Sequence, residues 1–264
     1  MIPEWVWVYL FLFAAAFTAG GVNAVAGGGT LLTFPTLLTV LTPRWGFADA
    51  SVFANATSTT ALVPGSLAGA WGFRRELAGA RRWLILLFAP SLLGGLAGAV
   101  LLTWAEAKYF KLVVPWLMLL ASLLFLAQPY LTRWFPPHPE AGRPSFGVQA
   151  AVVVFQFFVA VYGGYFGAGI GILMLTSLSF MGMGDIHQIN AVKTILAAVI
   201  NTASIAVFVV ADKIDWRYAP VMAVASILGG YYGAVLGRRL PRVLIRGFVI
   251  TLGLILAGYY FLQP

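Results

Sequence analysis

Eight long apolar segments dominate this chain, and each is close to twenty residues long. A helix of about 20 apolar residues crosses the hydrocarbon core of a bilayer, so these segments predict membrane spans. The segments cover residues 5–26, 50–73, 83–103, 111–128, 148–165, 189–211, 218–237 and 243–262. Two shorter runs, 30–41 and 170–181, are too short to cross comfortably, and they favour half-helices or re-entrant arms.

The composition agrees with a protein that spans the membrane many times. Hydrophobic residues make up 61% of the chain, charged residues only 9%, and the mean hydropathy is +0.92. The net charge of +8 comes from basic residues in short loops, as expected for an inner-membrane protein, and gives no reason to expect nucleic acid binding. The first tract lacks a basic leader region and therefore predicts a retained span, not a cleaved signal peptide.

The chain contains no cysteine, which excludes disulfides, thiolate metal sites and thiol catalysis. The histidines are few and apart, and we expect neither a metal nor a cofactor.

The sequence also repeats itself. An offset of 135 residues aligns Asn55 with Asn190, and it aligns "GGLAGAVL" from Gly94 with "GGYYGAVL" from Gly229. Upstream the offset becomes 140, because the first copy has about five extra residues in the predicted loop "LTPRWGFAD". We therefore predict a first repeat over 1–128, a Pro-rich linker over 129–147 and a second repeat over 148–264.

The charges of equivalent loops predict that the two repeats are inverted. The loop 74–82 carries four arginines and one glutamate, but its mate "DKIDWR" is neutral. One loop later the bias reverses, because "GRRLPRVLIR" is more basic than its mate "TWAEAKYFK". If basic loops are cytoplasmic, equivalent loops lie on opposite faces of the membrane. The expected fold is all-α, with two inverted repeats that each hold three full spans and a Gly-broken element, for 8 to 10 membrane segments in total.

This arrangement predicts a multi-pass protein of the inner membrane with a cytoplasmic linker. Both termini would then lie outside the cytoplasm.

Three consecutive glycines, Gly27 to Gly29, interrupt the first apolar region. Each glycine costs a helix roughly 1 kcal/mol relative to alanine, so the run predicts a break. The second repeat has a matching motif, "GYFGAGIGIL", with Gly167 and Gly169. Inverted repeats with broken helices are typical of secondary transporters, whose substrate lies near the midplane at the breaks. The positive N-terminal end of a half-helix starting at Thr30 would favour an anion.

Polar residues within the spans supply further candidates for the substrate site. Lys193 falls inside a predicted span and could neutralise an anion, although it could also extend toward the interface. Asn55 and Asn190 occupy equivalent places and would face each other across the pseudo-twofold axis, and interhelical hydrogen bonding is the structural alternative for them. The full set of candidates is Gly28, Gly29, Thr30, Asn55, Thr57, Ser58, Thr59, Gln156, Gly167, Gly169, Asn190, Lys193 and Thr194.

Other small residues have a simpler interpretation. Gly94, Gly95 and Gly98, with their mates Gly229, Gly230 and Gly233, lie in continuous spans and predict close helix packing.

Coupling or gating has three candidates near the ends of the polar spans. These are Asp49, Asp185 and His187, for which helix capping and an interfacial location are the structural alternatives. Both proton coupling and uncoupled diffusion stay open.

The segment "AGGGTLLTFPTL", the polar "ASVFANATST" and the mirrored second half resemble the sulfite exporter TauE/SafE family, also called the toluenesulfonate uptake permease family. The resemblance covers essentially the whole chain. It implies a transporter of small sulfur-containing anions such as sulfite, sulfoacetate or other organosulfonates, usually an exporter. The second copy departs from the pattern, because its glycines are interrupted and no proline follows at the place of Pro35.

Three alternatives remain beside a carrier. An anion channel or facilitated-diffusion pore could use the same residues. A membrane enzyme would need paired carboxylates, a metal cluster or a nucleophile with its base, and the sequence offers none of these patterns. A packing subunit would explain the glycines but not the matching polar clusters. The expected partners are a small anion and membrane lipids, and the sequence does not indicate the oligomeric state.

Overall fold

The structure is a computed structural model that describes residues 3–25, 28–72, 80–134, 145–181, 186–236 and 242–262. Within these ranges the chain forms helices joined by short turns and contains no strand. The helices are α1 (Glu4–Val25), α2 (Thr30–Gly72), α3 (Arg81–Trp104), α4 (Ala107–Trp134), α5 (Phe146–Tyr165), α6 (Ile170–Ser179), α7 (Ile186–Val210), α8 (Ala219–Leu236) and α9 (Arg242–Phe261).

Five helices of the described chain are long and apolar enough to cross a membrane. They cover Glu4–Ala24, Arg81–Trp104, Ala107–Leu131, Phe146–Tyr165 and Gln188–Val210. The remaining predicted spans fall on α2, α8 and α9. Of these, α2 is longer than any single crossing requires, and it carries three internal prolines.

The helix α2 is a hairpin of two arms. Its backbone leaves the helical conformation at Gly46, where φ is 70° and ψ is 162°. The hydroxyls of Thr33 and Ser58 share a hydrogen bond, yet 25 residues of straight helix would separate them by about 37 Å. The chain therefore reverses at Gly46, so that 30–45 and 47–72 lie side by side.

The turn corrects the loop predicted over "LTPRWGFAD". That segment is helical on both sides of Gly46, and the reversal is confined to one glycine. A φ of 70° is accessible to glycine and strained for other residues, so a single position can make the turn.

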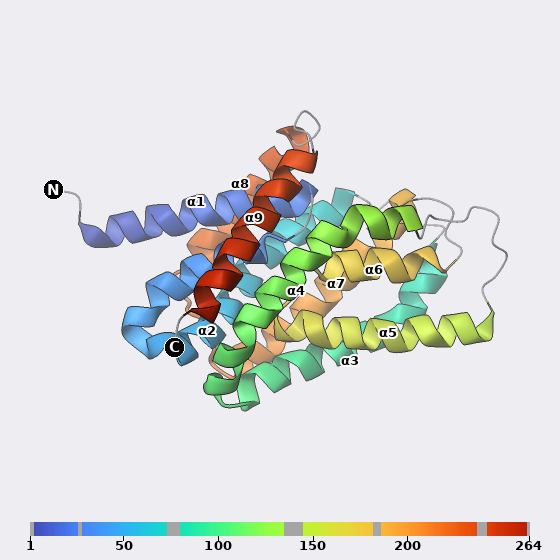
Figure 1. Ribbon diagram of the computed structural model, residues 1–264, viewed down its shortest axis with the longest axis horizontal. Helices are drawn as coiled ribbons and strands as arrows, with labels where there is room; N and C mark the ends of the chain where they lie inside the picture. Colours follow the sequence, from blue (N-terminus) through green and yellow to red (C-terminus); the bar gives the residue numbers. More distant parts are fainter. Residues whose placement is uncertain are drawn as a thin grey trace.

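Helices from the first and the second half of the chain pack in pairs. In Figure 1, α1 lies beside α8 at the top of the view and α3 lies beside α5 at the bottom, while α4 and α9 cross between them. The pair α1 and α8 is parallel: Tyr9 contacts Tyr218 just before α8, and Phe17 contacts Tyr232 further along.

The pair α3 and α5 is parallel as well. Ser91 accepts a hydrogen bond from Gln156, and one to two turns later Gly98 lies against the backbone of Val161. Both helices therefore run in the same direction from their starts at Arg81 and Phe146.

Glycines make the close approach in both pairs. A Cβ added to Gly94 would meet the carbonyl oxygen of Phe157 on α5, and one added to Gly229 would meet the carbonyl oxygen of Phe17 on α1. The predicted close-packing role of these two glycines is confirmed, because any side chain there would collide with a backbone.

Candidate functional site

The first helix break lies where the sequence predicts it. Helix α1 ends at Val25 and α2 begins at Thr30, with Gly28 at φ +90° between them. The amide of Leu31 donates to the carbonyl oxygen of Gly28, which closes the first turn of α2. Gly29 lies so close to the carbonyl oxygen of Ala19 that a Cβ would be 2.6 Å from it. Gly27 lies outside the described residues.

The second break separates α5 from α6. The backbone has positive φ at Gly167 (+83°) and Gly169 (+82°), and Gly169 caps the start of α6. The amide of Ile172 donates to Gly169 as Leu31 does to Gly28, so both half-helices begin with the same tight turn. Between the glycines, the carbonyl oxygen of Ala168 accepts a hydrogen bond from the Tyr162 hydroxyl at 2.7 Å.

The two breaks converge on one turn of α4. Gly28 faces the ring of Phe125, and a Cβ at Gly169 would lie 3.4 Å from Leu124 and 3.6 Å from Ala121. The segment 121–125 of α4 therefore contacts both breaks. Segments about 140 residues apart in the sequence meet at this place in the interior.

Buried aromatic rings join the first half-helix to the second break. Phe34 on the first arm of α2 packs edge-on against Phe166 in the second break, with ring centroids 5.5 Å apart. Phe110 of α4 contacts both rings, and all three side chains are fully buried. The first half-helix and the second break are thus in direct contact.

The second arm of α2 presents polar side chains to both breaks. Asn55 donates its amide to the carbonyl oxygen of Tyr165 at the end of α5, at 3.0 Å. One turn later Ser58 bonds Thr33, whose hydroxyl also donates to the carbonyl oxygen of Gly29. The predicted site residues Asn55 and Ser58 are therefore brought to opposite breaks by the same helix face.

The side-chain oxygen of Asn55 is buried and has no hydrogen-bond partner. Its residue is only 1% exposed, and buried polar atoms in native proteins are almost always bonded to protein or water. The amide oxygen of Asn55 is therefore free to accept a hydrogen bond from water or a ligand beside the second break, as is the equally unpaired Oε1 of Gln156 in the α3 and α5 interface.

Lys193 lies on α7 against the start of α6. The side-chain carbon Cδ of Lys193 would be 3.5 Å from a Cβ at Gly171, and its ammonium donates to Oδ1 of Asn190 at 3.1 Å. In the described chain the only ion pair joins Lys108 to Glu106, so the ammonium of Lys193 meets an amide and no carboxylate there. A cation thus lies beside the positive end of a half-helix, and the two together favour an anion.

Several predicted candidates have other contacts. Thr57 is fully buried and accepts a hydrogen bond from the backbone amide of Asp215, which anchors the connection between α7 and α8. Thr194 donates to the carbonyl oxygen of Asn190 on its own helix. Thr30 and Thr59 are half-buried on α2.

Two further candidates lie away from the breaks. Gln156 precedes Tyr165 by about 13 Å of helical rise and donates to Ser91 in the α3 and α5 interface. Asp49 is exposed just after the turn at Gly46. Asp185 and the side chain of His187 lie outside the described residues.

The structure adds residues that the sequence reasoning missed. Thr33 bonds both Gly29 and Ser58, Gly171 contacts Lys193, and Tyr162 bonds the loop of the second break. Their positions carried a usable signal: Thr33 comes four residues after the triglycine, and Tyr162 comes just before the first glycine of "GGYFGAG".

Comparison with known protein families identifies the chain. The family model of the sulfite exporter TauE/SafE matches residues 12–260, which is nearly the whole length. The chain belongs to this family. It is therefore a multi-pass membrane transporter for a small molecule, as the apolar spans and the resemblance of its glycine motifs predict.

Curated relatives carry names of the same kind. A probable membrane transporter protein of Haemophilus influenzae is 29% identical over 250 residues, covering 94% of this chain and 92% of the relative. The probable membrane transporter protein YfcA of Escherichia coli is 26% identical over 247 residues, with 94% and 87% covered. The probable membrane transporter protein YunE of Bacillus subtilis is 23% identical over 264 residues, with 95% and 96% covered. No solved structure matches the chain.

Proposed function

We propose that this protein is a secondary carrier that exports small sulfur-containing anions, such as sulfite, sulfoacetate or other organosulfonates, through a site between the two helix breaks. The observation that carries the proposal is the convergence of both breaks on residues 121–125 of α4, with Lys193 beside the start of α6. Substrate sites of secondary transporters lie at such discontinuous helices. The family's description as sulfite exporters supports the sulfur chemistry and the direction.

The donors at this place suit a sulfonate or sulfite group better than a phosphate monoester. One ammonium, the first amides of α6 and nearby hydroxyls offer several donors but a single full positive charge. A sulfonate spreads one negative charge over three oxygens, which suits that set. Carbonyl groups of the α5 end and the buried oxygen of Asn55 would accept hydrogen bonds from water that accompanies the ion.

Helix directions support an inverted arrangement of the two halves. Counting the two arms of α2 separately, α1 is first and α3 is fourth in one half, and α5 and α8 hold the same places in the other. If successive helices alternate in direction, halves of equal orientation would make α1 antiparallel to α8. The contacts of Tyr9 with Tyr218 and of Phe17 with Tyr232 instead follow a parallel pair.

Inversion would let the two halves exchange roles during transport. The interfaces of α1 with α8 and of α3 with α5 are built from equivalent glycines, so rocking of one half against the other would open the central site to alternate faces. On this model Asn55, Ser58, Lys193 and the glycines of the breaks line the site. Gln156 and Thr57 would stabilise the surrounding helices through their hydrogen bonds to Ser91 and Asp215. The remaining candidates would complete the wall of the site; they are Thr30, Thr59, Asn190 and Thr194.

Counterflow in proteoliposomes tests the proposal. Vesicles preloaded with sulfite, thiosulfate, sulfoacetate, taurine or a carboxylate analogue are assayed for uptake of the labelled anion, with wild type and Lys193→Ala. Loss of a hydrogen bond to a charged group costs about 1.5–3 kcal/mol, so we expect apparent affinity to fall about tenfold or more. Lys108→Ala, which removes an exposed lysine, is the matched control and should behave as wild type.

The outcomes separate the alternatives. Saturable uptake with trans-stimulation indicates a carrier, while conductance far above carrier rates indicates a channel. Unchanged affinity in a folded Lys193→Ala variant would show that Lys193 does not bind the anion. Failure of every sulfur anion to exchange would contradict the proposed substrate class.

A further inference from the structure

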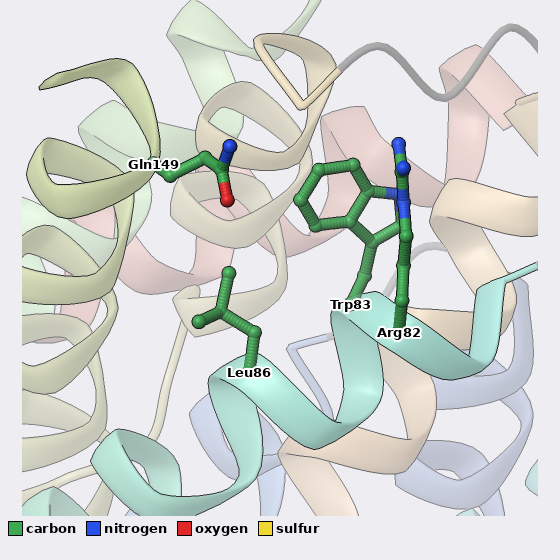
Figure 2. Close-up of a pocket in the computed structure, with 4 residues that line it drawn as sticks. All are labelled: Arg82, Trp83, Leu86 and Gln149. Carbon is green, nitrogen blue, oxygen red and sulfur yellow. The ribbon is translucent and has the colours of Figure 1, made fainter. Parts of the chain in front are cut away.

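A cavity lies apart from the helix breaks, between the first turns of α3 and α5. It has a volume of about 400 Å³ and is lined by Arg82, Trp83, Leu86 and Gln149. Figure 2 shows Gln149 of α5 facing the three α3 residues across the opening, with Leu86 beneath. Because α3 and α5 are parallel, both begin at this end of the molecule.

The lining of this cavity is polar at one end and apolar at the other. The guanidinium of Arg82 stacks on the indole of Trp83, 4.0 Å from the ring centroid. Arg82 is exposed, whereas Trp83 is only 4% exposed, so the guanidinium lies against a buried ring. Leu86 lies one turn deeper along α3 and supplies an apolar floor. An occupant that matches both ends must itself be amphipathic.

The cavity opens where a membrane surface would lie. Arg82 and Trp83 stand at the very start of the span Arg81–Trp104, and tryptophan and arginine are typical of the headgroup level. Ile85 and Phe88 follow within two turns on α3. Their side chains are 66% and 48% exposed in the isolated chain, as expected for side chains that face lipid. A lipid that contacts this face of α3 would therefore lie close to the cavity.

The positive charge of Arg82 at the polar end of the cavity favours an anionic headgroup. In the described chain Arg82 contacts an aromatic ring and no carboxylate, so its N–H groups remain available to an acceptor. A guanidinium is well suited to bind a phosphate through two parallel hydrogen bonds. Basic pockets between membrane helices on the cytoplasmic side bind anionic headgroups, and the basic segment that ends at Arg82 is the one predicted to be cytoplasmic.

We propose that the cavity between α3 and α5 binds an anionic phospholipid, with the headgroup phosphate on Arg82 and the glycerol and upper acyl carbons over Leu86. The site is independent of the proposed transport site, because it lies at the ends of α3 and α5 and shares no residue with the breaks. A volume of about 400 Å³ is within the range of small-molecule sites and accommodates a headgroup with its glycerol.

Lipid binding to the purified full-length protein tests this site. Phosphatidylglycerol and phosphatidylcholine with identical acyl chains are added to the protein in detergent, and bound lipid is counted by native mass spectrometry and by thermal stabilisation. We expect the wild type to bind phosphatidylglycerol at least tenfold more tightly than phosphatidylcholine. Arg82→Gln should lose this preference, and Leu86→Trp, which fills the cavity, should reduce binding of the anionic lipid as well.

Controls make each outcome decisive. Arg133→Gln removes another exposed arginine, in the last turn of α4, and should keep the wild-type preference. Inorganic phosphate alone is the probe for a free-anion site. Equal binding of both lipids, an unchanged preference in folded Arg82→Gln, or full competition by millimolar phosphate would each overturn the assignment.

Discussion

The two helix breaks share a backbone design but differ in charge. Both start a half-helix with a glycine at positive φ, and both lie against residues 121–125 of α4. At the first break, Ser58 faces the half-helix and closes a hydroxyl pair with Thr33. The position equivalent to Ser58, at the repeat offset of 135, is Lys193, which lies beside Gly171 at the second break.

If the two breaks are equivalent positions of a repeat, they keep the same backbone conformation while only one of them carries a charge. The hydroxyls at the first break satisfy each other, so that side is neutral and internally bonded. At the second break, the ammonium beside Gly171 has a neutral amide as its partner. Asn55, which bonds Tyr165 at the end of α5, has a side-chain oxygen with no partner. We therefore expect substrate recognition to depend mainly on the second half and structural integrity mainly on the first.

The largest expected effect comes from substituting the first break. In Gly28→Ala, positive φ costs about 1–2 kcal/mol and the new Cβ collides with the Phe125 ring, which adds about 1–3 kcal/mol. Gly169→Ala suffers the backbone strain but finds ordinary contact distances around its Cβ. Thermal unfolding in detergent should show the larger loss for Gly28→Ala, and Phe125→Leu should restore part of it. Equal losses in the two variants would contradict the comparison.

Where the halves are alike, matched substitutions should have matched effects. Gly94→Ala and Gly229→Ala each push a Cβ into a backbone carbonyl of the partner helix, so each should cost about 3 kcal/mol. For a protein of this size, the apparent unfolding temperature should fall by about 6–12 °C in both. Gly258→Ala, where nothing lies within 4 Å, is the control and should be neutral or slightly stabilising. A loss in only one of the pair would break the proposed equivalence of the interfaces.

The smallest expected effects are those of substituting the two asparagines, Asn55 and Asn190, and they should differ in kind. Asn55→Ala leaves the Tyr165 carbonyl without its donor and should cost about 1 kcal/mol of stability. Asn190→Ala removes a partner of the Lys193 ammonium and should alter anion affinity more than stability. Measuring the unfolding temperature and counterflow for both variants sharpens the comparison. The reverse assignment, with Asn55 affecting only affinity, would argue against it.

The sequence was sufficient to locate the breaks and the packing glycines. Glycines within apolar segments mainly break a helix or let two helices approach closely. The sequence repeat aligned Gly94 with Gly229 as a pair. The extent of the turn in α2 was not predictable, because Pro43, Arg44 and Asp49 resemble a loop although the helix continues on both sides of Gly46.

Contacts between distant segments were also beyond the sequence. Nothing in the spacing of Thr57 shows that the Asp215 amide will use its hydroxyl. Likewise, the approach of Lys193 to Gly171 depends on how α6 packs against α7, which helical periodicity does not specify. Local backbone preferences can thus be predicted from the local sequence, whereas contacts between side chains on different helices can be seen only in the packed structure.

The reactivity of one introduced thiol tests the central claim most directly, because the chain has no cysteine of its own. Gly171→Cys places a thiol beside Lys193, with space for its side chain. If the second break is a wet, positive anion site, a sulfonate-bearing thiosulfonate reagent will modify this thiol about tenfold faster than an ammonium-bearing one. Sulfoacetate will protect the thiol, and Lys193→Gln will abolish the preference for the anionic reagent. Equal rates for the two reagents, or no reaction with either, would contradict the account.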